Sequence, residues 1–279
     1  MKLGFVCINY FSFKDCERYV ESLSSQKDFK DYVIVIVDND SDEINRIALL
    51  NISYAYNNVK IIFNSSNIGY FSGLNVGIHY IKNNFTDIQA FVIGNNDLIF
   101  PNGFSQRIYN IKDILKKVPV ISPNIITNDG EHQNPHVINK ISFFREVIYD
   151  IYYSNFILAN IISRIASLTK SVTDRTDENS FDKAQFINQG HGSCYILSNL
   201  FFEYFHELLA PTFLMYEELF LSYQLNTKDF QVYYEPSIVV NHSWHSSFNI
   251  IPKKQIWLIA RKSHKISRQY FNPYKLKTW

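Results

Sequence analysis

The chain has 279 residues, which suffices for one large α/β domain or two small ones with a full hydrophobic core. Hydrophobic residues make up 46% of it and the formal net charge is +1, which argues against disorder and against overall nucleic-acid binding. The three cysteines are too few and scattered for a disulfide framework or a zinc site. No signal peptide and no 18-residue apolar run is found, so we expect a cytoplasmic protein.

Strands and helices alternate in the first 105 residues. Apolar, β-branched runs that indicate buried strands lie at residues 3–9, 32–37, 59–63 and 91–93. Helical segments between them are predicted at residues 13–24 and 43–50, and the segment from Ile68 to Gly77 leads into a third helix that runs through Ile81. This repeat of strand, polar loop and helix is typical of a doubly wound parallel sheet.

Polar residues follow each of these four strands. They are Asn9, then Asp38 to Asp40, then Asn67, then Asn95 to Asp97. Because the carboxyl ends of parallel strands meet at one edge of a sheet, these residues predict a ligand site at that edge. The last group offers one carboxylate and two amides, a set suited to Mg²⁺ or Mn²⁺ that carries a phosphate. The alternative is an Asx-rich turn that caps the next element.

The second half of the chain changes character. The patterns predict a short strand at 118–121, a polar loop at 125–133 and a helix at 140–170. A charged, polar segment at 171–182 is expected to be a mobile linker. After it we expect an ordered segment at 186–198, a helix at 199–208 capped by Ser198, and strands at 232–234 and 238–242.

Two further groups could carry chemistry. Glu217 and Glu218 start a helix, where they would either cap it or place one carboxylate in the site as a general base. Burial beside a second carboxylate raises a carboxyl pKa, which suits a general base. His242 ends an apolar strand, where it is either a core histidine or a metal ligand.

The end of the chain is strongly basic. After Glu235 there are eight Lys and Arg residues and no Asp or Glu, a local charge of +8, with aromatic residues interleaved. This pattern fits an anionic membrane surface, a nucleic acid, or only a solvated helix face.

Seven short motifs occur in an order that resembles a known family. They are Ile8-Asn-Tyr10, Val37-Asp-Asn-Asp-Ser-Asp42, Asn67-x-Gly-Tyr-Phe-x-Gly-x-Asn-x-Gly77, Gly94-Asn-Asn-Asp97, Gly192-Ser-Cys-Tyr-Ile-Leu197, Met215-Tyr-Glu-Glu218 and Tyr233-Tyr-Glu-Pro-x-x-x-Val-x-His242. From residue 3 to about 248 the chain resembles the family 2 inverting glycosyltransferases, especially the rhamnosyltransferase-like branch that builds bacterial surface polysaccharides.

The resemblance implies a GT-A fold, a Rossmann-like α/β structure whose mostly parallel central sheet is flanked by helices. It implies a glycosyltransferase domain at 1–248, with a nucleotide-sugar-binding half at 1–105 and an acceptor-side half at 106–248. The acceptor-side half would hold a helical insert at about 140–170, and residues 249–279 would form a basic, aromatic extension.

The resemblance also implies roles for single residues. Asp38 would bind the nucleobase or ribose, and Asp97 and His242 would hold Mn²⁺ or Mg²⁺. Glu218 would be the catalytic base, with Glu217 as the second choice. The other donor-binding residues would be Asn9, Asn39, Asn67, Gly69, Gly73, Asn75, Asn95 and Asn96.

Two positions of this chain depart from the family pattern. Asn95 replaces the first aspartate of the family's Asp-x-Asp motif, so a strict metal requirement stays open. Phe220 replaces a later acidic residue, so acceptor contacts there must differ.

The implied reaction is inverting transfer of a sugar from dTDP-rhamnose or a UDP-sugar to a lipid-linked or oligosaccharide acceptor in O-antigen or capsule synthesis. The basic extension would hold the enzyme peripherally on the anionic inner leaflet of the membrane, without a nucleic-acid partner. One alternative is a non-catalytic nucleotide-sugar-binding protein on the same fold. The other is a sugar nucleotidyltransferase, which the segment from Asn9 to Phe13 disfavours because it lacks a glycine-rich basic loop.

Overall fold

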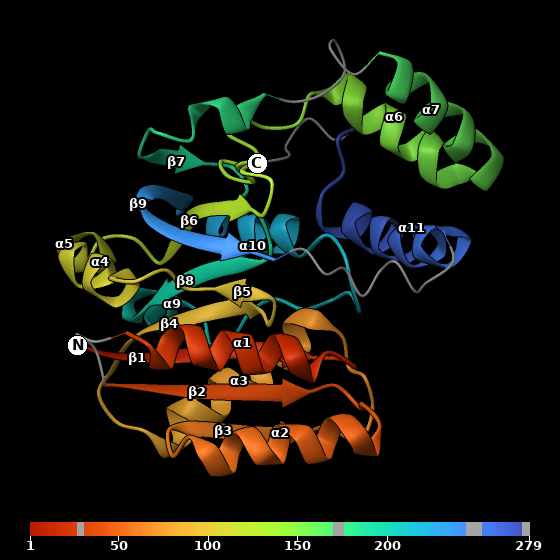
Figure 1. Ribbon diagram of the computed structural model, residues 1–279. Coiled ribbons are helices and arrows are strands. Elements are labelled where there is room, and N and C mark those ends of the chain that lie inside the picture. Colours follow the sequence, from red (N-terminus) through yellow and green to blue (C-terminus); the bar gives the residue numbers. More distant parts are fainter. Residues whose placement is uncertain (27–30, 170–175, 244–252, 275–279) are drawn as a thin grey trace.

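The computed structural model describes residues 1–26, 31–169, 176–243 and 253–274 (Figure 1). The strands are β1 Lys2–Asn9, β2 Tyr32–Asp38, β3 Val59–Phe63, β4 Ile88–Asn95, β5 Leu98–Ile99, β6 Val120–Thr127, β7 Gln185–Ile187, β8 Cys194–Ser198 and β9 Val232–His242. The helices are α1 Phe13–Ser24, α2 Glu43–Ala55, α3 Tyr70–Asn84, α4 Phe104–Asn110, α5 Lys112–Leu115, α6 Phe143–Ser154, α7 Phe156–Leu168, α9 Asn199–Tyr204, α10 Glu217–Asn226 and α11 Lys253–Tyr270, with a 3-10 turn at Asp177–Ser180.

One mixed sheet forms the centre of the molecule. Its strand order is β3-β2-β1-β4-β8-β6-β9-β5, and β7 pairs with β9. The first four strands in this order are parallel, β8 is antiparallel to its neighbours β4 and β6, and β6 and β9 are again parallel. The predicted α/β architecture, a mostly parallel central sheet flanked by helices, is confirmed, and the tips of β1 to β4 share one edge.

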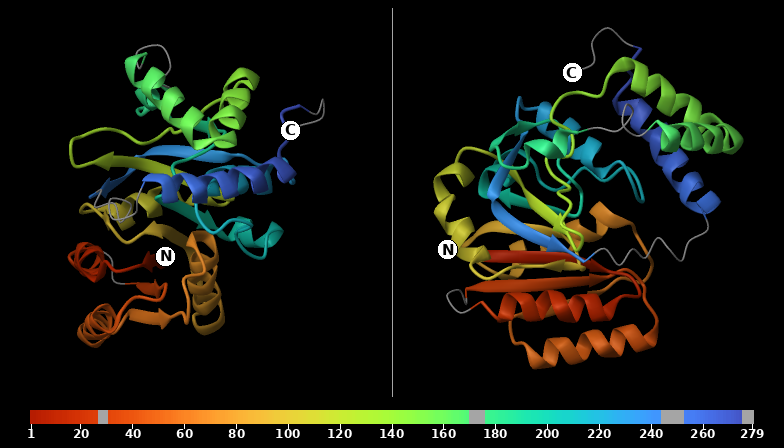
Figure 2. Two further views of the ribbon diagram at one scale, coloured as in Figure 1. Left: turned by 90° about the vertical axis from the view of Figure 1, so that its right-hand side faces the viewer. Right: turned by 45° about the horizontal axis from the view of Figure 1, so that its top comes forward.

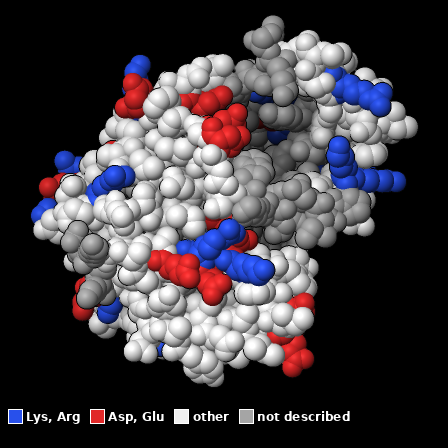
Figure 3. Space-filling view, in the orientation of Figure 1, with Lys and Arg blue, Asp and Glu red and all other residues white. Residues whose placement is uncertain are grey.

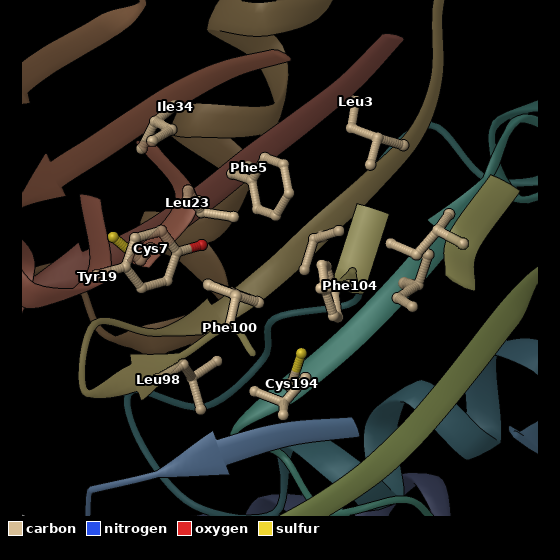
Figure 4. Close-up of a cluster of buried hydrophobic side chains, with 14 of the residues drawn as sticks. Leu3, Phe5, Cys7, Tyr19, Leu23, Ile34, Leu98, Phe100, Phe104 and Cys194 are labelled. Atoms are coloured by element: carbon tan, nitrogen blue, oxygen red, sulfur yellow. The ribbon is translucent and has the colours of Figure 1, made fainter. Parts of the chain in front are cut away.

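Helices cover both faces of this sheet (Figure 2). The alternation of side chains along β2 shows how: Val33, Val35 and Val37 pack toward α3, and Ile34 and Ile36 pack toward α1 and α2. Figure 4 shows the cluster under α1, where Phe5, Tyr19 and Phe100 meet edge to face at centroid distances of 5.5 and 4.9 Å. The sheet is therefore buried on both sides, as parallel sheets usually are.

Helix α3 packs against the sheet through glycines, which leave no room for a side chain between them. A Cβ atom on Gly77 would lie 2.3 Å from Val6 Cγ1, and one on Gly73 would lie 2.9 Å from Ile8 Cδ1. Larger residues at these positions would push α3 away from β1. Since the amino end of α3 borders the predicted site, this packing also sets the position of that border.

Several element boundaries differ from the sequence-based prediction. The strand predicted at 118–121 continues to Thr127, so the start of the predicted loop belongs to β6, where pairing with β9 satisfies its backbone. The predicted helix at 140–170 is two helices, because the Asn155 side chain accepts a hydrogen bond from Ile157 N (2.7 Å) and starts α7 anew. The two strands predicted in 232–242 form the single strand β9, whose register with β6 shifts after Pro123.

The predicted cap at Ser198 is wrong. Its hydroxyl donates to Val118 O (2.7 Å) instead of capping α9, because the tip of β8 is buried against the segment that leads into β6. Helix α9 also ends at Tyr204, before the predicted end at Leu208. Residues 171–175 of the predicted linker and the predicted domain boundary at 248 lie outside the described residues.

Helices α6, α7 and α11 lie beyond the edge of the sheet to which β2 points (Figure 1). Arg268 of α11 makes ion pairs of 2.8 Å with Glu146 and Asp150 of α6, and His264 Nε2 lies 2.7 Å from Asp150 Oδ1. These contacts attach the basic extension to the helical insert. None of the described helices has both the length and the apolar character needed to cross a bilayer.

Candidate active site

The tips of β1 and β2 form a buried polar corner. Asn9 Nδ2 donates to Asp38 Oδ1 (2.7 Å), and Ser41 N donates to Asp38 Oδ2 (3.1 Å). Asn9 and Asp38 are both fully buried. Hydrogen bonds to the charged form of a buried carboxylate offset the loss of its hydration. The hydrogen bonds of this corner hold the loop that follows β2. The predicted contact of Asp38 with a nucleoside stays a prediction.

Asn39 extends this corner toward β3 and α3. Its Nδ2 donates to Gly69 O (2.9 Å), and its Oδ1 accepts from Asn64 Nδ2 (2.8 Å). Asn67 Oδ1 accepts from Gly69 N (3.0 Å). Gly69 has φ +94°, and a Cβ there would lie 2.2 Å from Phe213 O, so only glycine fits. Three predicted donor-binding residues thus meet at the start of α3.

Asn75 points elsewhere. Its side chain donates to Leu208 O (2.8 Å) and accepts from Leu208 N (2.9 Å), so both polar atoms hold the loop after α9. Gly73 packs against β1 as described above. Donor binding by these two residues stays a prediction, and the contacts that the structure shows for them are structural.

The three polar residues after β4 point in different directions. Asn96 Nδ2 donates to Ser12 Oγ (2.8 Å) and to Asn9 Oδ1 (3.3 Å), and so faces α1. Asp97 faces β9, where its Oδ1 lies 3.1 Å from His242 Nε2. Asn95 Nδ2 lies 3.4 Å from the same nitrogen. The structure therefore brings the two predicted metal ligands together, because β5 pairs Leu98 with His242.

This pair fits a divalent cation. The Gln133 Oε1 atom lies 2.7 Å from His242 Nδ1 and can only accept, so Nδ1 donates to it and Nε2 is the ring nitrogen that faces Asp97. No hydrogen bond from the described part of the chain reaches Asp97 Oδ1. Adjacent ligands at about 2.1 Å from an octahedral cation are about 3.0 Å apart, close to the separation seen here.

A loop between β7 and β8 lies between the predicted metal ligands, Asp97 and His242, and the acidic pair, Glu217 and Glu218. Asn95 N donates to Ser193 O (2.9 Å), and the His191 and His242 ring centroids are 6.1 Å apart. Next to His191, Gly192 N donates to Glu218 Oε1 (3.1 Å). A Cβ on Gly192 would lie 2.5 Å from that oxygen, so glycine lets the carboxylate approach the backbone.

The two glutamates differ in environment. Glu217 is 7% exposed, and no hydrogen bond from the described residues reaches its Oε1. Glu218, in contrast, is half-buried. Burial, followed by the negative charge of Glu218, raises the pKa of Glu217 to about 8. At neutral pH Glu217 therefore keeps its proton.

An unusual turn holds the acidic pair in place. Met215 and Tyr216 both have positive φ, +70° and +73°, which costs about 1–3 kcal/mol for each such non-glycine residue. The turn is held by Thr212 Oγ1, which donates to Met215 O (3.1 Å), and by Ser263 Oγ of α11, which donates to Leu214 O (2.6 Å). Tyr216 Oη lies 2.8 Å from His264 Nδ1, also on α11.

Several residues of this site escaped the sequence-based prediction. Gln133 lies in a polar loop with no motif, and His264 lies in a helix outside the recognised motifs. His191 and Gly192 did have a local signal, since a histidine between two glycines suggests a close backbone approach. Burial, followed by His136 and His242, lowers the pKa of His191 to about 3, so its ring is neutral.

Comparisons with known proteins give the family and the fold of the chain. The profile of the family described as "Glycosyl transferase family 2" matches residues 5–175. No curated protein matches the sequence significantly. Similar solved structures include a mannosyltransferase, PcManGT from Pyrobaculum calidifontis, in complex with GDP-Man and Mn²⁺, which has 13% identity and a TM-score of 0.55 over 95% of this chain and 62% of that one.

Two further structures have the same fold. GalNAc-T7 with UDP, GalNAc and Mn²⁺ has 13% identity and a TM-score of 0.59, over 88% of this chain and 44% of that one. S. aureus TarS 1-349 in complex with UDP-GlcNAc has 11% identity and a TM-score of 0.56, over 88% of this chain and 60% of that one. At these identities the likeness shows the GT-A fold alone. The chain spans less than two thirds of the length of each of these three proteins.

Proposed function

The chain belongs to glycosyl transferase family 2, and from this premise we propose that it is an inverting glycosyltransferase that moves a sugar from a nucleotide-sugar to an acceptor hydroxyl. The observation that carries the proposal is the approach of Asp97 to His242 (3.1 Å) at the sheet edge, with Glu218 linked to the same edge through Gly192. The solved complexes with GDP-Man, UDP and UDP-GlcNAc support a nucleotide-sugar donor, and we propose dTDP-rhamnose or a UDP-sugar.

Asp97 and His242 would hold the divalent cation. Mn²⁺ or Mg²⁺, when bound, stabilises negative charge on the departing nucleoside diphosphate. Gln133 keeps the His242 ring oriented through Nδ1, and burial of both ligands strengthens their electrostatic effect. The corner of Asn9, Asp38 and Asn39 is proposed to contact the nucleoside, next to Asn67 and Gly69 at the start of α3.

Glu218 is proposed as the general base. The raised pKa expected of a base falls on Glu217 and keeps this residue protonated near neutral pH. Glu218, which reaches the sheet edge through Gly192, is therefore proposed to take the proton from the acceptor hydroxyl. The acceptor oxygen then forms the new bond at the anomeric carbon as the bond to the diphosphate breaks on the opposite side, which inverts the configuration. The Gly192 N–H holds the Glu218 carboxylate in position during this step.

We further propose that the acceptor lies at a membrane surface. Helix α7 exposes an apolar stripe of Ile157, Ile161, Ile165 and Leu168, whose exposed fractions run from 48% to 85%. The acidic residues of α6, α7 and α11 are Glu146 and Asp150, and Arg268 contacts both. Helices that expose an apolar face and carry eight basic but two acidic residues suit a peripheral position on anionic lipids. A lipid-linked glycan of O-antigen or capsule synthesis at the inner leaflet would be the acceptor.

The test is a panel of donors assayed for release of nucleoside diphosphate. The panel contains dTDP-rhamnose, UDP-galactofuranose, UDP-hexoses and GDP-mannose, each with Mn²⁺, with Mg²⁺ and with EDTA. We expect release with one donor and a loss in EDTA. Asp97→Asn and Glu218→Gln should each lower the rate by about 100-fold or more. Asp113→Asn, an exposed residue paired with Lys116, is the matched control and should keep the rate.

Other outcomes would favour the alternatives. Donor binding by thermal shift without any release, unchanged in Glu218→Gln, would indicate a non-catalytic nucleotide-sugar-binding protein. Formation of a nucleotide-sugar from a nucleoside triphosphate and a sugar phosphate would indicate a nucleotidyltransferase.

A further inference from the structure

A second cluster of metal-binding side chains lies outside the candidate active site. His79 projects from α3, and His206 and Glu207 lie in the loop after α9. One ligand atom from each of the three lies within 4.8 Å of the other two. At the α-helical rise of 1.5 Å per residue, His79 is about 14 Å along α3 from Tyr70, which borders the active site. The proposed glycosyl transfer does not use these residues.

The geometry within the cluster fits a tetrahedral cation. His79 Nε2 lies 3.4 Å from Glu207 Oε2, and the His79 and His206 ring centroids are 5.2 Å apart. Two ligands at 2.0–2.1 Å from a tetrahedral Zn²⁺ are about 3.4 Å apart. The His79 Nε2 atom is itself buried, and no hydrogen bond from the described chain reaches it. An ion would satisfy this nitrogen.

The backbone that carries the ligands is held in advance. Asn75, one helical turn before His79, makes two hydrogen bonds with the backbone of Leu208. Gln224 of α10 holds the same loop from the other side, since its Nε2 donates to Glu207 O (2.7 Å) and its Oε1 accepts from Leu209 N (2.9 Å). Fixing a loop before the ligand binds lowers the entropy cost of binding.

The cluster also borders open space. A cavity of about 430 Å³ is lined by residues that include His79, Glu207 and Pro211. It leaves room for water as a fourth ligand, as in zinc sites with three protein ligands.

We propose that His79, His206 and Glu207 bind one borderline divalent cation, of which Zn²⁺ is the best match to two imidazoles and a carboxylate. The ion would tie α3 to the loop after α9. That loop runs on to Phe213, whose carbonyl accepts from Tyr70 N (3.0 Å), and then to the turn before the acidic pair. The role of the ion is structural and does not depend on the proposed activity.

The test is titration of the metal-free full-length chain with Co²⁺, read by its visible absorption, and with Zn²⁺, read by the melting temperature. We expect one Co²⁺ with the intense bands of tetrahedral coordination, and a rise in Tm with Zn²⁺. Both signals should persist in His242→Ala, which removes a ligand of the proposed active-site cation. The affinities for Co²⁺ and for Zn²⁺ should each fall at least tenfold in His79→Ala and in Glu207→Gln.

Two comparisons keep the proposal testable. Glu203→Gln, at an exposed position on α9, is the matched control and should bind as the unaltered chain does. His206→Ala changes an exposed side chain, so it tests the site even if His79→Ala fails to fold. Unaltered affinity in His206→Ala and Glu207→Gln, or signals lost only in His242→Ala, would overturn the proposal.

Discussion

Glu217 and Glu218 are neighbours in the chain but do not share an environment. Glu217 is buried with a raised pKa, whereas Glu218 is half-buried and accepts a hydrogen bond from Gly192 N. When two carboxyl groups lie close together in different surroundings, their protons are held with different strength. This difference in environment is our reason for assigning the base to Glu218.

The raised pKa of Glu217 predicts a pH-dependent stability. In the unfolded chain Glu217 ionises near its usual pKa of 4.5, whereas in the folded chain it keeps its proton up to about pH 8. The free energy of unfolding should therefore fall as the pH rises from about 4.5 to 8. In Glu217→Gln this fall should be smaller, which urea unfolding at pH 5 and pH 8 will measure. The exposed control Glu203→Gln should follow the unaltered chain, and equal slopes for all three proteins would refute the expectation.

At the scale of elements, α11 contributes to the site although it follows the family motifs in the chain. The Nε2 atom of His264 in α11 lies 2.7 Å from Asp150 Oδ1, which can only accept, so Nε2 donates to it. The other ring nitrogen, Nδ1, then accepts a hydrogen bond from the Tyr216 hydroxyl (2.8 Å). Burial lowers the pKa of His264, which agrees with a neutral ring. The strained turn at Met215 and Tyr216 is thus held from outside by α11.

Removal of the Tyr216 hydroxyl tests this support. Tyr216→Phe deletes the hydrogen bond to His264, worth about 1 kcal/mol, so we expect kcat to fall by about fivefold. The KM for the donor should change little, because the tips of β1 to β4 are unaltered. Steady-state kinetics will measure both constants, with Tyr204→Phe, an exposed tyrosine on α9, as the control. A normal kcat in Tyr216→Phe would show that α11 does not position the acidic pair.

On the scale of the whole molecule, helices α6, α7 and α11 combine an excess of basic residues with exposed apolar surface. Helices α6, α7 and α11 stand apart from the sheet, and on the face seen in Figure 3 their described residues show Lys and Arg but no Asp or Glu. On α11 the exposed Lys254, Lys262 and Lys265 lie at helical spacing along one stripe. The apolar stripe of α7 has four side chains with exposed fractions of 48% to 85%, an arrangement that often marks an interaction surface.

Vesicle binding tests this surface. We expect the full-length chain to cosediment with anionic vesicles and much less with neutral ones, and more weakly at high salt. At about 1 kcal/mol for each basic residue, alanine at Lys254, Lys262 and Lys265 should weaken binding by about 100-fold. The matched control replaces three exposed lysines of another region, Lys112, Lys116 and Lys117. Equal losses in the two triple variants would rule out a specific membrane face.

The sequence by itself determined β1 to β4 and α1 to α3, although not the exact ends of all of them. Residues 59–63 and 13–24 match β3 and α1, because buried β-branched runs and amphipathic periods are local patterns. It also placed polar residues at the tips of β1 to β4, since parallel strands end at one edge. The family motifs singled out Asp97 and His242 although 145 positions separate them, and pairing of β5 with β9 brings them together.

Tertiary structure alone decided which polar residues lie at the candidate site and which bond only to other parts of the fold. Asn75 and Ser198 look like site or capping residues in the sequence, yet both bond distant backbone groups, at Leu208 and Val118. Gln133 and His264 have no local signal at all, because their roles come from a partner more than 40 residues away. Local patterns follow from the backbone geometry of neighbouring residues. The partner of a polar side chain depends on how separate elements pack, which short-range sequence does not encode.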